Sequence, residues 1–207
     1  MRIESVAARP DRVGRYRIVW EDGSVLRLYR QTLEDYGLYA GMELEPQTAE
    51  RLRQDAGKMS AKMRAVRILA ASSVSEKALE QRLVQKGETP EDARSAVRWM
   101  SDMELVDDRK TAEQVVSSCI RKGYGPSRAR QALYEKRIPR ELWEEALADY
   151  PDQTGAIVSF LRSRLGEEYT EPELRKAVAA LQRRGHSYGS IHAALRQMKI
   201  DEEFLED

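Results

Sequence analysis

The segment RKGYGPSRARQALYEKRI, residues 121–138, determines how the rest of this chain is interpreted. A shift of 62 positions places it, without a gap, on RRGHSYGSIHAALRQMKI, residues 183–200. Gly123 then falls on Gly185, and Leu133 falls on Leu195. A weaker copy lies about 50 positions before the first. Three copies of a helical unit predict a tandem array in which each unit buries its apolar face on its neighbours.

Apolar residues recur at helical spacing from Met59 onward. Met63 and Val66 are expected to open an apolar stripe, and sets such as Ala93, Ala96, Val97 and Met100 follow the i, i+3, i+4, i+7 pattern of an amphipathic helix. The spacing of the copies is longer than two helices require, so three helices per unit fit better. We expect eight or nine helices in residues 59–207.

Helix ends are also marked in the sequence. Capping boxes are predicted at Ser73 with Glu76 and at Thr170 with Glu173. Thr89 precedes Pro90, which fits the first position of a helix. Gly123 and Gly185 stand where a left-handed C-cap belongs.

The first fifty or so residues have the pattern of β-strands. Two runs flank Asp22-Gly23, a pair typical of a tight hairpin turn. Tyr16, Ile18 and Trp20 alternate before the turn, and Val25 and Leu28 are expected to continue the apolar pattern after it. Residues 1–8 and 41–46 are predicted as further strands, and residues 46–57 as a short helix.

The predicted fold class is therefore mainly α, a tandem array of three-helix repeats preceded by a small β-rich N-terminal module. The predicted bounds are 1–57 for the β-rich module, and 58–108, 109–153 and 154–207 for helical repeats 1, 2 and 3.

Charge is balanced overall but segregated along the chain. With 35 basic and 35 acidic residues, no global field attracts a nucleic acid or a membrane. Residues 62–86, 120–137 and 175–199 are basic, whereas residues 88–108, residues 138–153 and the tail 201–207 are acidic. Acids at helix starts and bases at helix ends explain part of this alternation. Alternatively, the basic helix pairs share one face and form a discontinuous cationic stripe for phosphates or an acidic protein.

The candidate residues for binding a partner or a nucleic acid come from the two related segments. They are Arg121, Lys122, Tyr124, Arg128, Arg130, Lys136, Arg183, Arg184, Tyr188, Arg196 and Lys199. An aromatic ring beside arginines can stack on bases or anchor an interface. The favoured alternative for Tyr124 and Tyr188 is that each packs over the turn between two helices.

Patterns typical of catalysis or metal binding are missing from the sequence. One cysteine and two histidines make no zinc site of usual spacing, and neither a phosphate-binding loop nor a G-x-S-x-G motif is present. We therefore expect no enzyme, no cofactor and no metal. Cys119 lies in an apolar stripe and is expected to be packed. No signal peptide or membrane-spanning run is evident, which favours a cytoplasmic protein with no membrane partner.

Two motifs, LVDDRKTAEQVV at residues 105–116 and RKGYGPSRARQAL at residues 121–133, resemble the RecX regulators of bacterial recombination in order and separation. The resemblance covers residues 60–150 well and 154–207 more loosely, and residues 1–57 would be a variable extension. The family usually has an aromatic residue where Thr111 stands, which puts a core contact in doubt. It also favours a glycine near Arg137, and its absence here could alter a helix end.

The resemblance implies a monomeric, non-enzymatic modulator of the RecA recombinase. Such a protein would bind the RecA filament on single-stranded DNA and inhibit strand exchange, ATPase and coprotease activity. Direct contact with single- or double-stranded DNA is left open. The alternatives are a sequence-independent DNA-binding helical protein, which would show a steep salt dependence with bare DNA, and a generic helical-repeat scaffold for protein interactions.

Overall fold

A computed structural model of the chain describes residues 1–166 and 168–200, so the acidic tail 201–207 lies outside the described residues. The chain divides into two compact units, Met1–Asp107 and Asp108–Asp207, and each is described by itself. Within the described ranges, no helix combines the length and the apolar character needed to cross a membrane.

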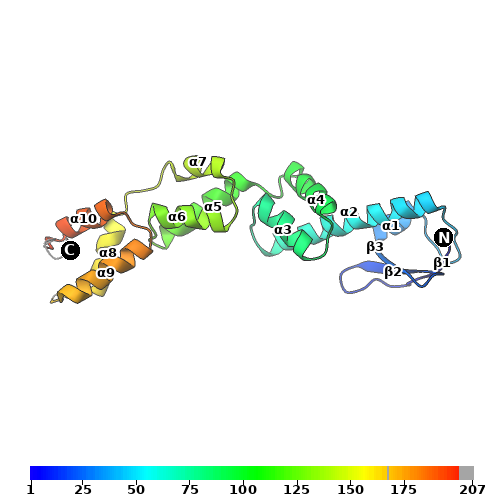
Figure 1. Ribbon diagram of the computed structural model, residues 1–207, viewed down its shortest axis with the longest axis horizontal. Helices are drawn as coiled ribbons and strands as arrows, with labels where there is room; N and C mark the ends of the chain where they lie inside the picture. The colour runs from blue at the N-terminus through cyan, green and yellow to red at the C-terminus, as the bar shows by residue number, and fades with distance from the viewer. Residues whose placement is uncertain (167, 201–207) are drawn as a thin grey trace. The chain divides into compact units, whose positions relative to one another are not determined.

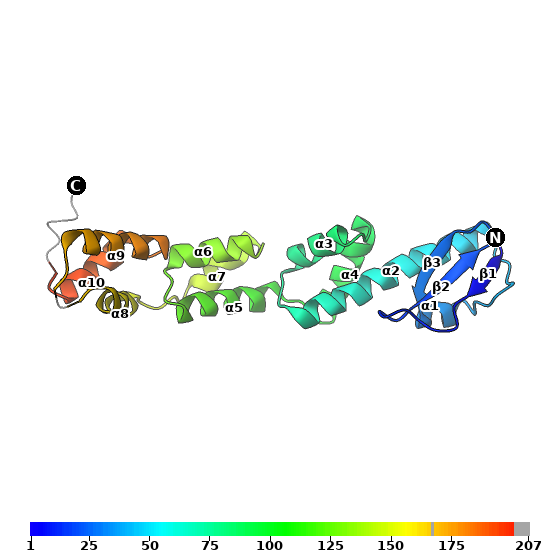
Figure 2. The same ribbon diagram turned by 90° about the horizontal axis from the view of Figure 1, so that it is seen from below.

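The first unit joins a small sheet to helices (Figures 1 and 2). Strands β1 (Ile3–Val6), β2 (Arg15–Trp20) and β3 (Val25–Tyr29) form an antiparallel sheet in that order. Helices α1 (Arg30–Asp35), α2 (Pro46–Ala71), α3 (Glu76–Gln85) and α4 (Pro90–Asp102) follow. Helix α2 packs on β3 and also on α3 and α4, so it connects the sheet to the first helical repeat.

The β2–β3 hairpin confirms the predicted turn but corrects one of its core residues. Ile18, Trp20 and Leu28 are buried, as expected. Val25 is 45% exposed because it pairs with Val19, whereas Ile18 pairs with Leu26; in a pleated sheet, neighbouring pairs face opposite sides. At the turn only Gly23 has a positive φ (79°), and the Asp22 side chain instead accepts a hydrogen bond from the backbone of Ser24.

Two other expectations for the N-terminal segment are wrong. Residues 41–46 form a single bridge between Glu43 and Arg2 rather than a strand. The helix that starts at Pro46 does not stop near Gly57 but continues to Ala71. A Cβ atom at Gly57 would lie 2.8 Å from a carboxylate oxygen of Asp92 on α4, so a larger residue at this position would require the Asp92 side chain to shift.

The buried face of α2 is formed mostly by alanines. Ala61 and Ala65 are fully buried and Ile68 is 9% exposed, whereas Met63 and Val66, predicted to open the apolar stripe, are 37% and 39% exposed. Helix α4 packs closely against this alanine face. The hydrophobic period was correct, but its phase was set by close helix packing rather than by the largest side chains.

Most predicted helix ends are confirmed. Thr89 caps α4 with Pro90 at its first position, and Thr170 with Glu173 forms a capping box. The N-cap of α3 is Ser75, whose hydroxyl accepts from the backbone of Ala78, rather than Ser73. The helix therefore begins two residues later than the predicted box implied.

The second unit holds two sets of three helices. Its elements are α5 (Asp108–Arg121), α6 (Pro126–Glu135), the short 3-10 helix η1 (Arg140–Leu142), α7 (Trp143–Leu147), α8 (Thr154–Arg164), α9 (Glu171–Arg183) and α10 (Tyr188–Gln197). The 62-position shift places α5 and α6 on α9 and α10. The mainly α fold of three-helix repeats behind a β-rich module is confirmed.

Each unit contains two hydrophobic clusters among the described residues. In the first unit one cluster joins the sheet to the start of α2, and the other joins the rest of α2 to α3 and α4. In the second unit one cluster centres on Leu133 and the other on Leu195. Cys119 is buried as expected, and burial raises the pKa of its thiol. The exact bounds of the four predicted segments stay a prediction.

Candidate functional site

The two basic segments each contain a glycine turn of the same conformation. Gly123 (φ 62°) ends α5 and Gly185 (φ 86°) ends α9, which confirms the predicted left-handed C-caps. The backbone N–H groups of Tyr124 and His186 donate to the carbonyls of Cys119 and Leu181, closing both turns in the same way. Lys122 and Arg184 therefore occupy equivalent positions on equivalent turns.

The two turns lie against each other in the second unit. The backbone N–H of Gly125 donates to the carbonyl of Arg184 at 2.9 Å, and that of Ser127 donates to the carbonyl of Gly185 at 3.3 Å. A Cβ atom on Gly185 would overlap the backbone of Arg128. The contact depends on glycine because the two backbones leave no space for a side chain.

Arg184 bridges the two turns. Its Nη2 donates to the carbonyl oxygen of Lys122 at 2.7 Å. Its guanidinium carbon lies 5.3 Å from the ring centre of Tyr124 and 5.1 Å from that of Phe160. The Tyr150 hydroxyl also donates to the backbone carbonyl of Tyr124 at 2.8 Å. Tyr124 and Arg184 are thus half-buried members of the turn-to-turn junction.

His186 belongs to the same junction. Its Nε2 lies 3.1 Å from the carbonyl oxygen of Gly123, so it donates a hydrogen bond there in the neutral ring. Burial lowers the pKa of His186, and the neighbouring Arg184 guanidinium acts in the same direction. Tyr188, two residues later, is 52% exposed and its ring centre lies 3.8 Å from that of His192.

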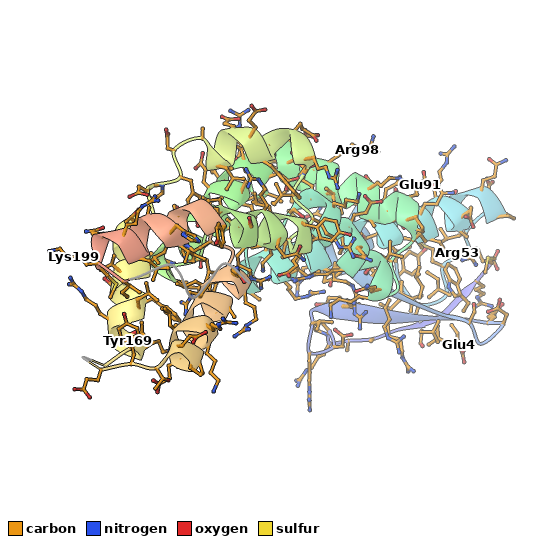
Figure 3. All side chains as sticks on the ribbon, turned by 60° about the vertical axis from the view of Figure 1, so that its left-hand side comes forward. Glu4, Arg53, Glu91, Arg98, Tyr169 and Lys199 are labelled. Atoms are coloured by element: carbon orange, nitrogen blue, oxygen red, sulfur yellow. The ribbon has the colours of Figure 1, made fainter. Side chains whose placement is uncertain are left out.

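The remaining candidates differ in how they are engaged. Arg128 is ion-paired with Glu135 at 3.0 Å, and the hydrogen bonds from Gln131 and Arg128 lower the pKa of that carboxyl. The exposed candidates are Arg121, Lys122, Arg130, Lys136, Arg183, Arg196 and Lys199. Arg196 lies in the last turn of α10, and Lys199, labelled in Figure 3, follows the end of that helix. Within the described residues, no side-chain hydrogen bond or ion pair joins either of them to the junction.

A groove of about 410 Å³ lies next to the junction, and Arg183 is one of its lining residues. Arg164, Lys176 and Phe160 also line it, with Glu173 as the acidic member. The Arg164 guanidinium lies 5.6 Å from the Phe160 ring centre. Arg164 and Phe160 were missed because they come from α8, which has no counterpart in the repeat. Lys176 could have been found, since it is seven positions before Arg183 on one helix face.

The structure also explains the absent glycine near Arg137. Arg137 has a φ of 58° and Lys199 a φ of 56°, and the equivalent residue of the first repeat is Gly87, with a φ of 93°. The helix end is therefore unaltered: Arg137 adopts the left-handed conformation that a glycine would adopt with less strain. Thr111, the other departure, is buried at 6% exposure.

These features define a class: a helical-repeat protein with a basic junction between consecutive repeats. A family described as "RecX, second three-helix domain" matches residues 107–147. The chain is 35% identical over 136 residues to "Regulatory protein RecX" of Xanthomonas axonopodis pv. citri, covering 64% of this chain and 84% of that protein. The chain belongs to the RecX family of regulatory proteins.

Two further comparisons agree. "Regulatory protein RecX" of Cronobacter sakazakii is 38% identical over 96 residues, which span 42% of this chain and only 58% of that relative. A solved structure, "Crystal structure of regulatory protein RecX", superposes with a TM-score of 0.66 over 94% of this chain and 98% of the other, at 20% identity. The structural likeness concerns the fold alone.

Proposed function

We propose that this protein is a non-enzymatic, cytoplasmic modulator of the RecA recombinase. It binds the RecA filament on single-stranded DNA as a monomer and inhibits strand exchange, ATPase and coprotease activity. The observation that carries this proposal is the 35% identity to a regulatory protein RecX over 84% of that relative. Consecutive helical repeats suit a filament with repeated binding sites, because several modest contacts add through effective concentration.

We further propose that the exposed basic residues around the turn-to-turn junction bind the filament. The junction holds its turns by backbone contacts, so neighbouring side chains are displayed on a rigid support. Arg130 and Arg183 are the best test residues because both are exposed and neither forms an ion pair with another described residue. Arg128 is less suitable, because its replacement by Glu would also place two carboxylates together at Glu135.

The test measures RecA ATPase on single-stranded DNA with substoichiometric amounts of this protein. We expect the parent protein to lower the rate. The double variant Arg130→Glu with Arg183→Glu should need about tenfold more protein for half-inhibition, which corresponds to about 1.4 kcal/mol of lost binding. The matched control is Arg94→Glu with Arg98→Glu, two exposed residues of α4 with the same charge change.

The outcomes separate the function from the residues. A parent protein with no effect on RecA would contradict the proposed function. Inhibition that is unchanged in the junction variant, or weakened equally in the control, would contradict only the assigned residues. Equally tight binding to naked DNA and to RecA filaments would favour the alternative of a DNA-binding helical protein.

A further inference from the structure

The first unit contains a second basic site that lies outside the junction. A groove of about 610 Å³ is bordered by the loop between β1 and β2, the last turns of α2, and α3. Five basic residues line it: Arg15 from the start of β2, Arg64 and Arg67 from α2, Arg82 from α3, and Lys86 from the C-cap of α3. No acidic residue is among the described residues that line this groove.

Two of these five cations are neutralised by carboxylates just outside the groove. Arg15 is paired with Asp11 at 2.8 Å. Arg64 is paired with Glu88 at 2.5 Å, and the Glu88 side chain is only 7% exposed. A buried pair of this kind holds the elements in place and contributes little net charge to a ligand.

The other three cations are not paired with a carboxylate among the described residues. Arg67 donates to the hydroxyl of Tyr29 at 3.0 Å, and Arg82 donates to the hydroxyl of Ser72 at 3.1 Å. These acceptors are neutral, so they orient the guanidinium groups without cancelling their charge. Lys86 is exposed and forms no ion pair in the described part of the chain.

The groove is also too large for a single small anion, and its floor is partly apolar. Val13, Ile68 and Ala71 contribute aliphatic surface between the cations. A ligand that fits must therefore carry several negative charges at short intervals, with less polar groups between them. A nucleic-acid strand has this chemistry, since each nucleotide adds one phosphate and a sugar, and arginine is the residue best suited to phosphate oxygens.

We infer that this groove binds the phosphodiester backbone of a nucleic-acid strand through Arg67, Arg82 and Lys86. Contacts to phosphate carry no sequence information, so binding is independent of base sequence. Three phosphate contacts on a single strand correspond to a slope of about −2 in a plot of log affinity against log salt concentration. This binding requires no RecA, and its residues are not among those proposed to bind the filament.

The test uses the full chain and a fluorescein-labelled oligothymidylate, with no RecA present. Arg82→Glu with Lys86→Glu reverses two charges of the groove, and Arg94→Glu with Arg98→Glu again serves as the control because it makes the same charge change on α4, outside the groove. Arg98, labelled in Figure 3, is exposed. We expect the groove variant to lose at least tenfold in affinity and its salt slope to flatten by about 1.4, with both quantities nearly unchanged in the control.

A second variant guards against misfolding. Arg82→Gln with Lys86→Gln removes the charges without adding new ones, and it should bind with intermediate affinity while its thermal unfolding matches the parent. Equal losses in the groove and control variants, or no loss in either, would overturn the inference. Competition by polyglutamate as strong as by unlabelled oligothymidylate would also overturn it, because the site would then recognise an acidic protein segment.

These outcomes are distinct from those for RecA. A groove variant that loses oligonucleotide binding, while the parent has no effect on RecA ATPase, would support the groove and contradict the proposed function. If the groove variant kept its oligonucleotide binding while the parent protein lowered RecA ATPase, only the inference about the groove would be contradicted.

Discussion

The second and third repeats share a helix pair but differ in what packs around it. Helices α5 and α6 correspond to α9 and α10, and the glycine turns between them have the same conformation. However, α7 follows its pair and packs mainly on α5, whereas α8 precedes its pair and packs mainly on α10. An equivalent position in the sequence therefore repeats the local backbone but not the surroundings.

The two capping glycines offer the strongest way to break this equivalence. Gly123→Ala should cost about 1 kcal/mol, because the only penalty is a left-handed backbone in open space. Gly185→Ala should cost about 4 kcal/mol, because the new Cβ atom also overlaps the backbone of Arg128. Urea unfolding measures the loss of stability in each variant, and hydrogen exchange of α9 and α10 shows whether those helices are affected. Equal losses would show that the turns do not pack as described.

A smaller difference should appear with pH, because His186 stands where the second repeat has Tyr124. Burial lowers the pKa of His186, so the folded state binds a proton less readily than the unfolded state. The stability that this group contributes is complete above its unfolded pKa of about 6.5 and is lost as the pH falls. We expect His186→Gln to flatten this acid-side decline in chemical denaturation curves. A decline that is unchanged in the variant would contradict the assignment to His186.

The smallest expected effect would sharpen the comparison, since it should have the same sign in both repeats. Arg137→Gly and Lys199→Gly should each stabilise the protein by about 0.5 kcal/mol, because relief of left-handed strain slightly exceeds the entropic cost of glycine. The control is Arg130→Gly, which should destabilise by about 1 kcal/mol because Arg130 lies inside α6. Thermal melts of the three variants measure these changes in stability. A loss of stability in Arg137→Gly would contradict the strain argument.

Part of the candidate site could be predicted from the repeat alone. The glycine turns, the exposed arginines and the Thr170–Glu173 capping box depend on residues close together in the chain. The contact between the turns could not be predicted, because nothing in the sequence shows that Gly125 and Gly185 are adjacent. Phe160 was missed for a similar reason, since it reaches Arg184 from a helix outside the repeated segment.

The groove in the first unit illustrates the same limit. The sequence shows that residues 62–86 are basic, but this count includes Arg64, whose charge is cancelled by Glu88. It also omits Arg15, which joins the groove from the start of β2, far away in the chain. Only pairing distances separate the neutralised cations from Arg67, Arg82 and Lys86.

By itself, the sequence determined the mainly helical repeats, their capping glycines, the β-hairpin at the amino end and the likeness to RecX regulators. Each of these depends on periodicity or on short-range backbone preference, which neighbouring residues encode directly. The tertiary structure alone decided three features: the continuity of α2 through Gly57, the contact between the two turns, and which cations of the groove are paired with carboxylates. These features depend on close approach and charge pairing between distant residues, and such distances are set only when the elements pack.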